Sequence, residues 1–238
     1  MEKYTNGGIE LNKKDFLWGA FLIAIVAFLI YPSTQSLFVL ATKAHPYLMG
    51  FIKVSILASM GELLALRISV GDYRKPKGFI YRFFIWGFIG ISFVLVFDLF
   101  AIGVSGVMDK GLLPSLDKGS MAGKLLYAFL TSTLMNLIFA PTFMAFHRVT
   151  DTFIDLGEGK LSKILKVDMG AVIKSIDWNG FIGFVILKTI PFFWIPAHTV
   201  TFMLPGEYRV LAAALLSIAL GGLLAFSRKK AASINIQA

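Results

Sequence analysis

The sequence lacks cysteine altogether and has few charged residues. Without cysteine, the chain has no means of forming a disulfide, an iron–sulfur cluster or a thiolate–metal site. Charged residues make up only 16% of its 238 residues, whereas soluble domains carry about 25%. Hydrophobic residues make up 57%. This composition is typical of a protein that crosses a membrane several times, and the length suits one membrane domain.

Histidine is also scarce, and the common catalytic motifs are absent. His45, His147 and His198 lie in unrelated parts of the sequence, which argues against a metal site. The sequence contains no HExxH, no paired-carboxylate motif and no glycine-rich phosphate loop with its lysine. We therefore expect no enzyme, no cofactor and no bound metal.

Long apolar runs are present instead. A membrane-spanning helix needs about 20 predominantly apolar residues, and about six runs approach that length. The sequence therefore predicts an all-α transmembrane helix bundle. The expected order is a tail at 1–15, an additional N-terminal span within 16–40, a membrane domain over 41–227 with spans at 47–68, 79–106, 121–146, 180–204 and 209–226, and a basic tail at 228–238.

Lysine and arginine are unevenly distributed along the chain. Most of the 23 basic residues lie in the N-terminal tail, the second and fourth loops, or the C-terminal tail. Basic loops favour the cytoplasmic side, so both termini are expected there. No import presequence is visible, which favours a prokaryotic inner membrane over an organelle membrane. The net charge of +9, without a nucleic-acid-binding motif, indicates anionic lipid as the partner and no nucleic acid.

The basic loop before the fifth span has helical periodicity. Apolar residues between 160 and 176 recur at 3.6-residue spacing, with Lys160, Lys163, Lys166 and Lys174 mostly off that stripe. This pattern predicts an amphipathic cytoplasmic helix. The helix either lies against anionic lipid headgroups or docks on the bundle.

Several polar residues fall inside the expected spans, where such residues are costly and normally face the bundle interior. Counted from the span ends at about 1.5 Å per residue, Glu62 and Lys188 share one depth. Lys53 and Asp98 share another. We therefore expect two intramembrane ion pairs, which either line a polar path or hold the helices in register. The other candidates for a polar path are Asn136, His198 and Arg209.

Prolines interrupt two of the expected spans. Pro191 and Pro196 fall within "KTIPFFWIPAHTVTFMLPGEYR", residues 188–209, and Pro141 falls in the fourth span. Proline removes a backbone donor and kinks a helix, so each position is an expected kink. The bend of the fifth span either opens a path through the bundle or fits the packing of its neighbours.

One short motif raises the question of proteolysis. "GVSG", residues 103–106, resembles the G-x-S-G around the nucleophile of rhomboid intramembrane proteases, which also have a six-helix core. The resemblance implies a dyad of Ser105 and His198, both toward the outer side of the membrane. In rhomboids the serine begins a helix, whereas Ser105 ends the expected one. An intramembrane serine protease is therefore the remote alternative.

Two longer regions together resemble another family. "KAHPYLMGFIKVSILASMGE", residues 43–62, is similar to the A-H-P helix start and apolar span of the Mpv-seventeen family, which includes the peroxisomal membrane protein of twenty-two kilodaltons. "IPAHTVTFMLPGEYR", residues 195–209, is similar to its C-terminal motif. Ile195 stands for the family's tryptophan, Thr201 for its asparagine, and His198 near its glutamine. The resemblance covers about 41–227 and suggests a bacterial-type member.

The resemblance implies a small integral membrane protein, and some members of the family are regarded as pores for small solutes. It brings no catalytic residues. The expected function is accordingly a channel or pore-like passage for small hydrophilic solutes. A secondary transporter that uses the proline-broken fifth span and a structural or assembly protein are the alternatives. Small residues four apart on the last span, Ala213, Ser217 and Gly221, favour close helix packing and a possible homo-oligomer.

Overall fold

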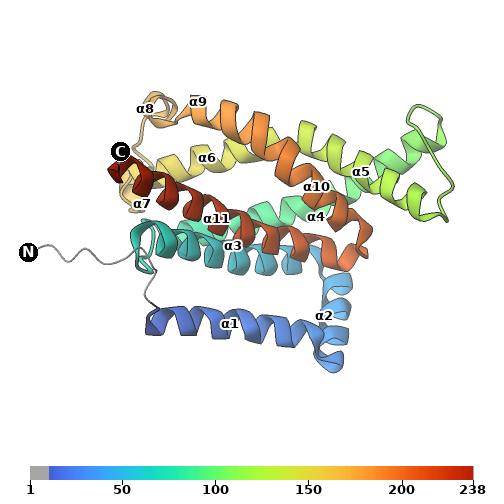
Figure 1. Cartoon of the computed structure of the whole chain (residues 1–238), viewed down its shortest axis with the longest axis horizontal. Coiled ribbons are helices and arrows are strands. Elements are labelled where there is room, and N and C mark those ends of the chain that lie inside the picture. Colours follow the sequence, from blue (N-terminus) through green and yellow to red (C-terminus); the bar gives the residue numbers. More distant parts are fainter. Residues whose placement is uncertain (1–10, 238) are drawn as a thin grey trace, which may run out of the picture.

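A computed structural model describes the chain over residues 11–237 and its side chains over 11–223. Regular structure in the described residues is entirely helical (Figure 1). In chain order the helices are α1 (Lys13–Ile30), α2 (Pro32–Ala44), α3 (Pro46–Val70), α4 (Phe79–Asp109), α5 (Met121–Ile138), α6 (Ala140–Leu156), α7 (Leu161–Ile164), α8 (Met169–Ser175), α9 (Trp178–Gly180), the π-helix η1 (Phe181–Trp194), α10 (Ile195–Met203) and α11 (Gly206–Gln237).

Long apolar helices dominate the fold. Five segments in the described residues are long and apolar enough to cross a membrane: α3, α4, α5, the continuous α9–η1–α10 segment, and α11 to Leu223. The bent pair α1–α2 makes a sixth if it counts as one span. The expected all-α bundle of apolar helices is therefore confirmed. The starts of α4 and α5 coincide with the predicted starts of the third and fourth spans.

The first expected span, within 16–40, is two helices rather than one. Tyr31 has an extended backbone and separates α1 from α2, which meet at a bend of 84°. A residue before proline is pushed out of the helical region, and Pro32 is well suited to begin a helix. As a result, α2 crosses one end of the bundle instead of continuing α1 (Figure 1).

Polar contacts attach α1 to α3. Asp15 accepts hydrogen bonds from Arg67 at 2.8 and 2.7 Å, and Arg67 is only 5% exposed. The Nε1 of Trp18 donates to the Met60 carbonyl oxygen at 3.2 Å. At the same end, Lys14 hydrogen-bonds to Asp72 and thereby lowers the pKa of that carboxyl. These contacts fix the position of α1 against the bundle.

The centre of the bundle is α3, which packs against α4 and α11. Where α3 meets α4, a Cβ added to Gly90 would lie 2.2 Å from the carbonyl oxygen of Gly50. Where α3 meets α11, a Cβ on Gly61 would lie 3.3 Å from the Cα of Ile218. Glycine therefore permits two close backbone approaches around α3, as small residues do in membrane helix packing.

Helix geometry changes next to two of the three prolines expected to kink, Pro141 and Pro196. The fourth expected span divides at Phe139 into α5 and α6, and Pro141 stands in the first turn of α6. Pro191 lies inside η1, whose π-helical form gives way to α-helix at Ile195. Pro196 occupies the first turn of α10. The fifth span is thus one continuous helical segment of two helix types.

The amphipathic helix expected at 160–176 is wrong as a single element. The chain forms the short helices α7 and α8, because the Asp168 side chain accepts the Ala171 N–H at 3.0 Å and begins a new helix. Val172 on α8 is fully buried, and α8 contacts α6. Docking on the bundle is therefore observed for α8, while Leu165 remains 77% exposed.

Candidate functional site

A cavity of about 460 Å³ lies inside the bundle. Its walls come from α3, α4, α5, α6, η1, α10 and α11. On α3 the lining runs over residues 58–65, on α4 over 86–97 and on α11 over 213–221. The cavity therefore occupies the half of the bundle toward α7 and α8, the end at which α1 begins and α11 ends (Figure 1).

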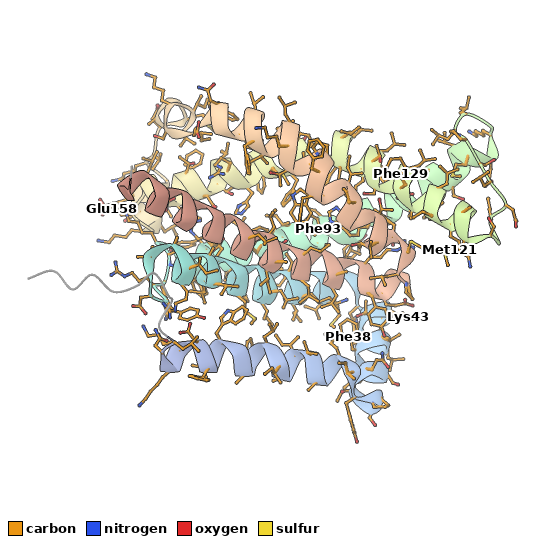
Figure 2. The ribbon with its side chains drawn as sticks, in the orientation of Figure 1. Phe38, Lys43, Phe93, Met121, Phe129 and Glu158 are labelled. Carbon is orange, nitrogen blue, oxygen red and sulfur yellow. The ribbon has the colours of Figure 1, made fainter. Side chains whose placement is uncertain are left out.

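Aromatic side chains form much of the cavity wall. Phe93 of α4 lies inside the bundle (Figure 2), where its ring contacts that of Phe143 from α6 with centroids 5.1 Å apart. Phe139 stacks on Phe143 at 5.9 Å. These residues, with Phe181 and Val185 of η1, give the cavity an apolar middle. Its clusters of polar side chains lie in two places, and Thr189 and Ser217 are further polar residues of the wall.

The first polar place is at the α7–α8 end of the cavity. Glu62 of α3 accepts a hydrogen bond from the Trp86 Nε1 at 2.8 Å. The Trp86 ring meets the His147 ring edge-on, with centroids 4.2 Å apart. One turn further along α6, Asp151 forms an ion pair with the buried Arg82 at 2.7 Å. Three helices, α3, α4 and α6, thus bring five polar side chains together.

Three polar atoms in this group are buried without a hydrogen-bond partner: Oε2 of Glu62, Nδ1 of His147 and Oδ1 of Asp151. The last of these belongs to the ion pair with Arg82. The nearest carboxylate to the His147 nitrogen is Asp151, at 3.5 Å. Glu62, His147 and Asp151 each offer one ligand atom, and these atoms all lie within 4.8 Å of one another. Buried polar groups normally have a partner, so this arrangement is suited to binding something further.

The second polar place is deeper, where α5 meets α10. The buried Asn136 amide contacts Nδ1 of the buried His198 at 3.1 Å and donates to the Ser132 carbonyl oxygen at 2.8 Å. The His198 ring stacks on the Trp194 ring, with centroids 5.1 Å apart. Nε2 of His198 and Nε1 of Trp194 are buried without a partner, and both residues line the cavity.

Beyond His198 lie two buried phenylalanines, and the Phe97 ring is 5.7 Å from the His198 ring. Phe97 and Phe202 are 3% and 2% exposed, and their rings lie 5.4 Å apart. On the other side, the Arg209 guanidinium lies 5.4 Å from the Phe202 ring. Arg209 belongs to a separate outer recess, whose polar lining residues are Asp98, Ser105, Asp109, Tyr127 and Arg209. The Phe97–Phe202 pair thus lies between His198 of the cavity and Arg209 of the recess.

The two expected ion pairs are wrong. Lys188 is exposed and forms no ion pair within the described part of the chain. Lys53 is buried, but its ammonium donates to the Glu207 carbonyl oxygen at 3.3 Å and lies over the Phe38 ring. Asp98 is exposed in the outer recess. Matching depth was not enough, because depth does not specify the direction in which a side chain leaves its helix.

Other expected site residues separate into the two cavities. Asn136 and His198, from different spans, meet in the inner cavity. Ser105 lines the outer recess instead, so the serine and histidine of the protease alternative lie in different cavities.

Sequence reasoning missed Arg82, Trp86, His147 and Asp151. His147 and Asp151 are four residues apart, a spacing that places both on one helix face. The predicted end of the fourth span at residue 146 left this pair outside the membrane domain's interior. An acidic residue four positions after a histidine was the available signal.

Comparison of the chain with protein-family models, with curated proteins and with solved structures finds no match. The resemblance to the Mpv-seventeen family therefore remains a prediction.

Proposed function

We propose that the protein is a membrane carrier that binds a small solute in the central cavity and releases it past the Phe97–Phe202 pair. The observation that supports this best is a cavity of about 460 Å³ that lies toward one end of the bundle and has the buried Phe97–Phe202 pair on its other side. Small-molecule sites typically have volumes of about 300–1,000 Å³. A one-sided cavity suits alternating access, in which a barrier on one side opens as the other closes.

The helix beside the cavity also favours a carrier. Transporters often place irregular helices at their substrate sites, because unwound turns free backbone carbonyls and permit bending. Here the wall includes η1, a π-helix that contains Pro191 and changes to α-helix at Ile195. Thr199 and Ser132 both donate to the Ile195 carbonyl oxygen, at 2.7 Å each. Two side-chain hydrogen bonds therefore stabilise the backbone where η1 changes to α10.

The chemistry of the lining suggests the class of solute. The apolar aromatic middle fits a compact organic body, and the polar groups at both ends fit hydrogen-bonding or charged substituents. Unpartnered atoms of Glu62, His147, Trp194 and His198 face this space from its two ends. We therefore propose a small solute with polar groups at its ends.

A channel for small hydrophilic solutes is the second candidate, favoured by the outer recess. The recess lies beyond Phe202, so rotation of the two phenylalanines would join it to the cavity. The proposed setting for either function is a prokaryotic inner membrane, with both termini and the α7–α8 end of the cavity in the cytoplasm. The concentration of basic residues in the tails and in the loops at that end supports this orientation.

Single-cysteine labelling tests the aqueous path without knowledge of the solute, because the chain has no native cysteine. Ser217→Cys introduces a thiol in the cavity wall, and Leu95→Cys introduces one on the exposed, lipid-facing side of α4. In vesicles, a membrane-impermeant maleimide should label the Ser217 variant from the cytoplasmic side and leave the Leu95 variant unlabelled. Equal labelling of the two variants contradicts an aqueous cavity.

Functional reconstitution separates carrier from channel. A carrier should give saturable uptake and counterflow of labelled small solutes in liposomes, whereas a channel should give discrete conductance steps in planar bilayers. Phe97→Ala should increase leak through either, because it opens the barrier, while Phe192→Ala should not, because Phe192 is 81% exposed outside the bundle. If the parent protein and both variants are folded but give neither saturable uptake nor conductance steps, the transport proposal is contradicted.

A further inference from the structure

We propose that Glu62, His147 and Asp151 bind one divalent transition-metal ion of the Zn²⁺ and Mn²⁺ class. The site lies at the α7–α8 end of the cavity and takes ligands from α3 and α6. It does not depend on the transport proposal, since a bound ion at this position could equally join the two helices. The proposal departs from the sequence expectation of no metal, which rested on the three histidines lying far apart.

The geometry is close to that of a metal site. The three ligand atoms lie within 4.8 Å of one another. Nitrogen and oxygen ligands stand about 2.0–2.2 Å from zinc, which in a tetrahedral site places them roughly 3.4 Å apart. Shifts of about an ångström in the flexible side chains would therefore bring all three ligand atoms within bonding distance of one ion. The four-residue spacing of His147 and Asp151 places both on the α6 face that lies toward Glu62.

Unpartnered atoms are the independent sign of a missing ligand. Oε2 of Glu62 and Nδ1 of His147 are fully buried and make no hydrogen bond. A buried polar atom without a partner carries a desolvation cost of about 1–3 kcal/mol. A metal ion would give both atoms a bond at the same time.

The residues around the three ligands make hydrogen bonds of the kind that orient the ligands of a metal site. Trp86 donates to Oε1 of Glu62 and so orients the carboxylate with Oε2 free. Arg82 pairs with Asp151 at 2.7 Å, but it also hydrogen-bonds Asp155 at 2.8 Å and the Lys77 carbonyl oxygen at 3.1 Å. Asp151 can therefore turn toward a metal while Arg82 keeps Asp155 as its partner.

The ligand types define the class of ion. Imidazole is a preferred ligand of zinc and neighbouring transition metals, and two carboxylates add the harder oxygen ligands that manganese accepts. Calcium and magnesium prefer all-oxygen sites, so one histidine among three ligands disfavours them. Three protein ligands leave open positions on the ion, and these would face the cavity.

Direct metal binding by the full-length, untagged protein in detergent tests the site. After chelator treatment and dialysis, titration with Co²⁺ followed by visible absorption, and with Zn²⁺ followed by calorimetry, should show one ion per chain. Mg²⁺ and Ca²⁺ should not displace it. Glu62→Gln, His147→Ala and Asp151→Asn should each weaken binding at least tenfold, and Trp86→Phe about 10–100-fold.

Matched controls separate the site from adventitious binding. Glu158→Gln and His45→Ala change the same residue types outside the cavity and should leave the affinity unchanged. The proposal is overturned if the parent protein binds no Co²⁺ or Zn²⁺, if Ca²⁺ competes equally, or if the control variants lose as much affinity as Glu62→Gln. Because the parent protein's binding is itself decisive, a variant that fails to fold does not remove the test.

Discussion

At Gly90 the difference between hydrogen and a methyl group decides whether two helices can pack. A Cβ there would lie 2.2 Å from the Gly50 carbonyl oxygen and 2.9 Å from the Val54 Cβ. The first of these is backbone, which moves only if the helix moves. At Gly103, on the same helix, a Cβ would meet nothing within 4 Å. Close packing therefore excludes a side chain at Gly90, whereas the space around Gly103 accepts one.

These two glycines give a matched prediction. Gly90→Ala should destabilise the protein by about 1–3 kcal/mol, because the added methyl forces α3 and α4 apart. Gly103→Ala should be neutral or slightly stabilising, since alanine is the better helix former. Unfolding of both variants by denaturant in detergent measures the difference. Equal stabilities would show that α3 and α4 are not in close contact.

At the scale of elements, α1 depends on a small number of polar contacts with α3. Arg67 and Asp15 form a two-bond ion pair whose side chains are 6% and 15% exposed. Lys14 and Asp72 form a pair nearby whose side chains are 56% and 43% exposed. Burial distinguishes the two pairs, since exposed ion pairs contribute about 0–1 kcal/mol.

Breaking the buried pair should be costly. Arg67→Met leaves Asp15 without its main partner and should reduce the free energy of unfolding more than any change at the exposed Lys14–Asp72 pair. Lys14→Met should cost less than about 1 kcal/mol. Adding Asp15→Asn to Arg67→Met should recover part of the loss, because no unpaired carboxylate remains. A double-mutant cycle measures this coupling, and simple additivity would contradict a direct interaction.

At the scale of the whole molecule, the helices pass back and forth so that α1 begins where α11 ends (Figure 1). The turn between α3 and α4 lies at that same end, and the 110–120 loop lies at the other. The basic residues concentrate at the first end, in tails and loops. The expected orientation therefore assigns opposite compartments to these two loops.

Impermeant thiol reagents also test this orientation. Ser115→Cys, in the 110–120 loop, should react in intact right-side-out vesicles. Lys75→Cys, in the turn after α3, should react only after the membrane is opened. The reverse pattern would place both termini outside and invert the proposed direction of the cavity.

The class of the protein and the approximate starts of its long apolar helices follow from the sequence alone. Hydropathy is a property of consecutive residues, so the runs that became α3, α4, α5 and α11 were visible without any structure. Proline also acts locally, and Pro141 and Pro196 indeed stand where the helix geometry changes. The bend at Tyr31, which divides the first span, and the break between α7 and α8 were not expected.

The tertiary structure alone decided which polar residues meet. Glu62 is beside Trp86, His147 and Asp151, while Lys188 points away from the bundle at the same expected depth. The sequence specifies how far along a helix a residue lies, but the rotation of each helix depends on packing against its neighbours. In η1 the π-helical turn changes even the rotation from one residue to the next. The depth of a residue along its helix can therefore be read from the sequence, whereas the side chains that it contacts depend on how the helices pack.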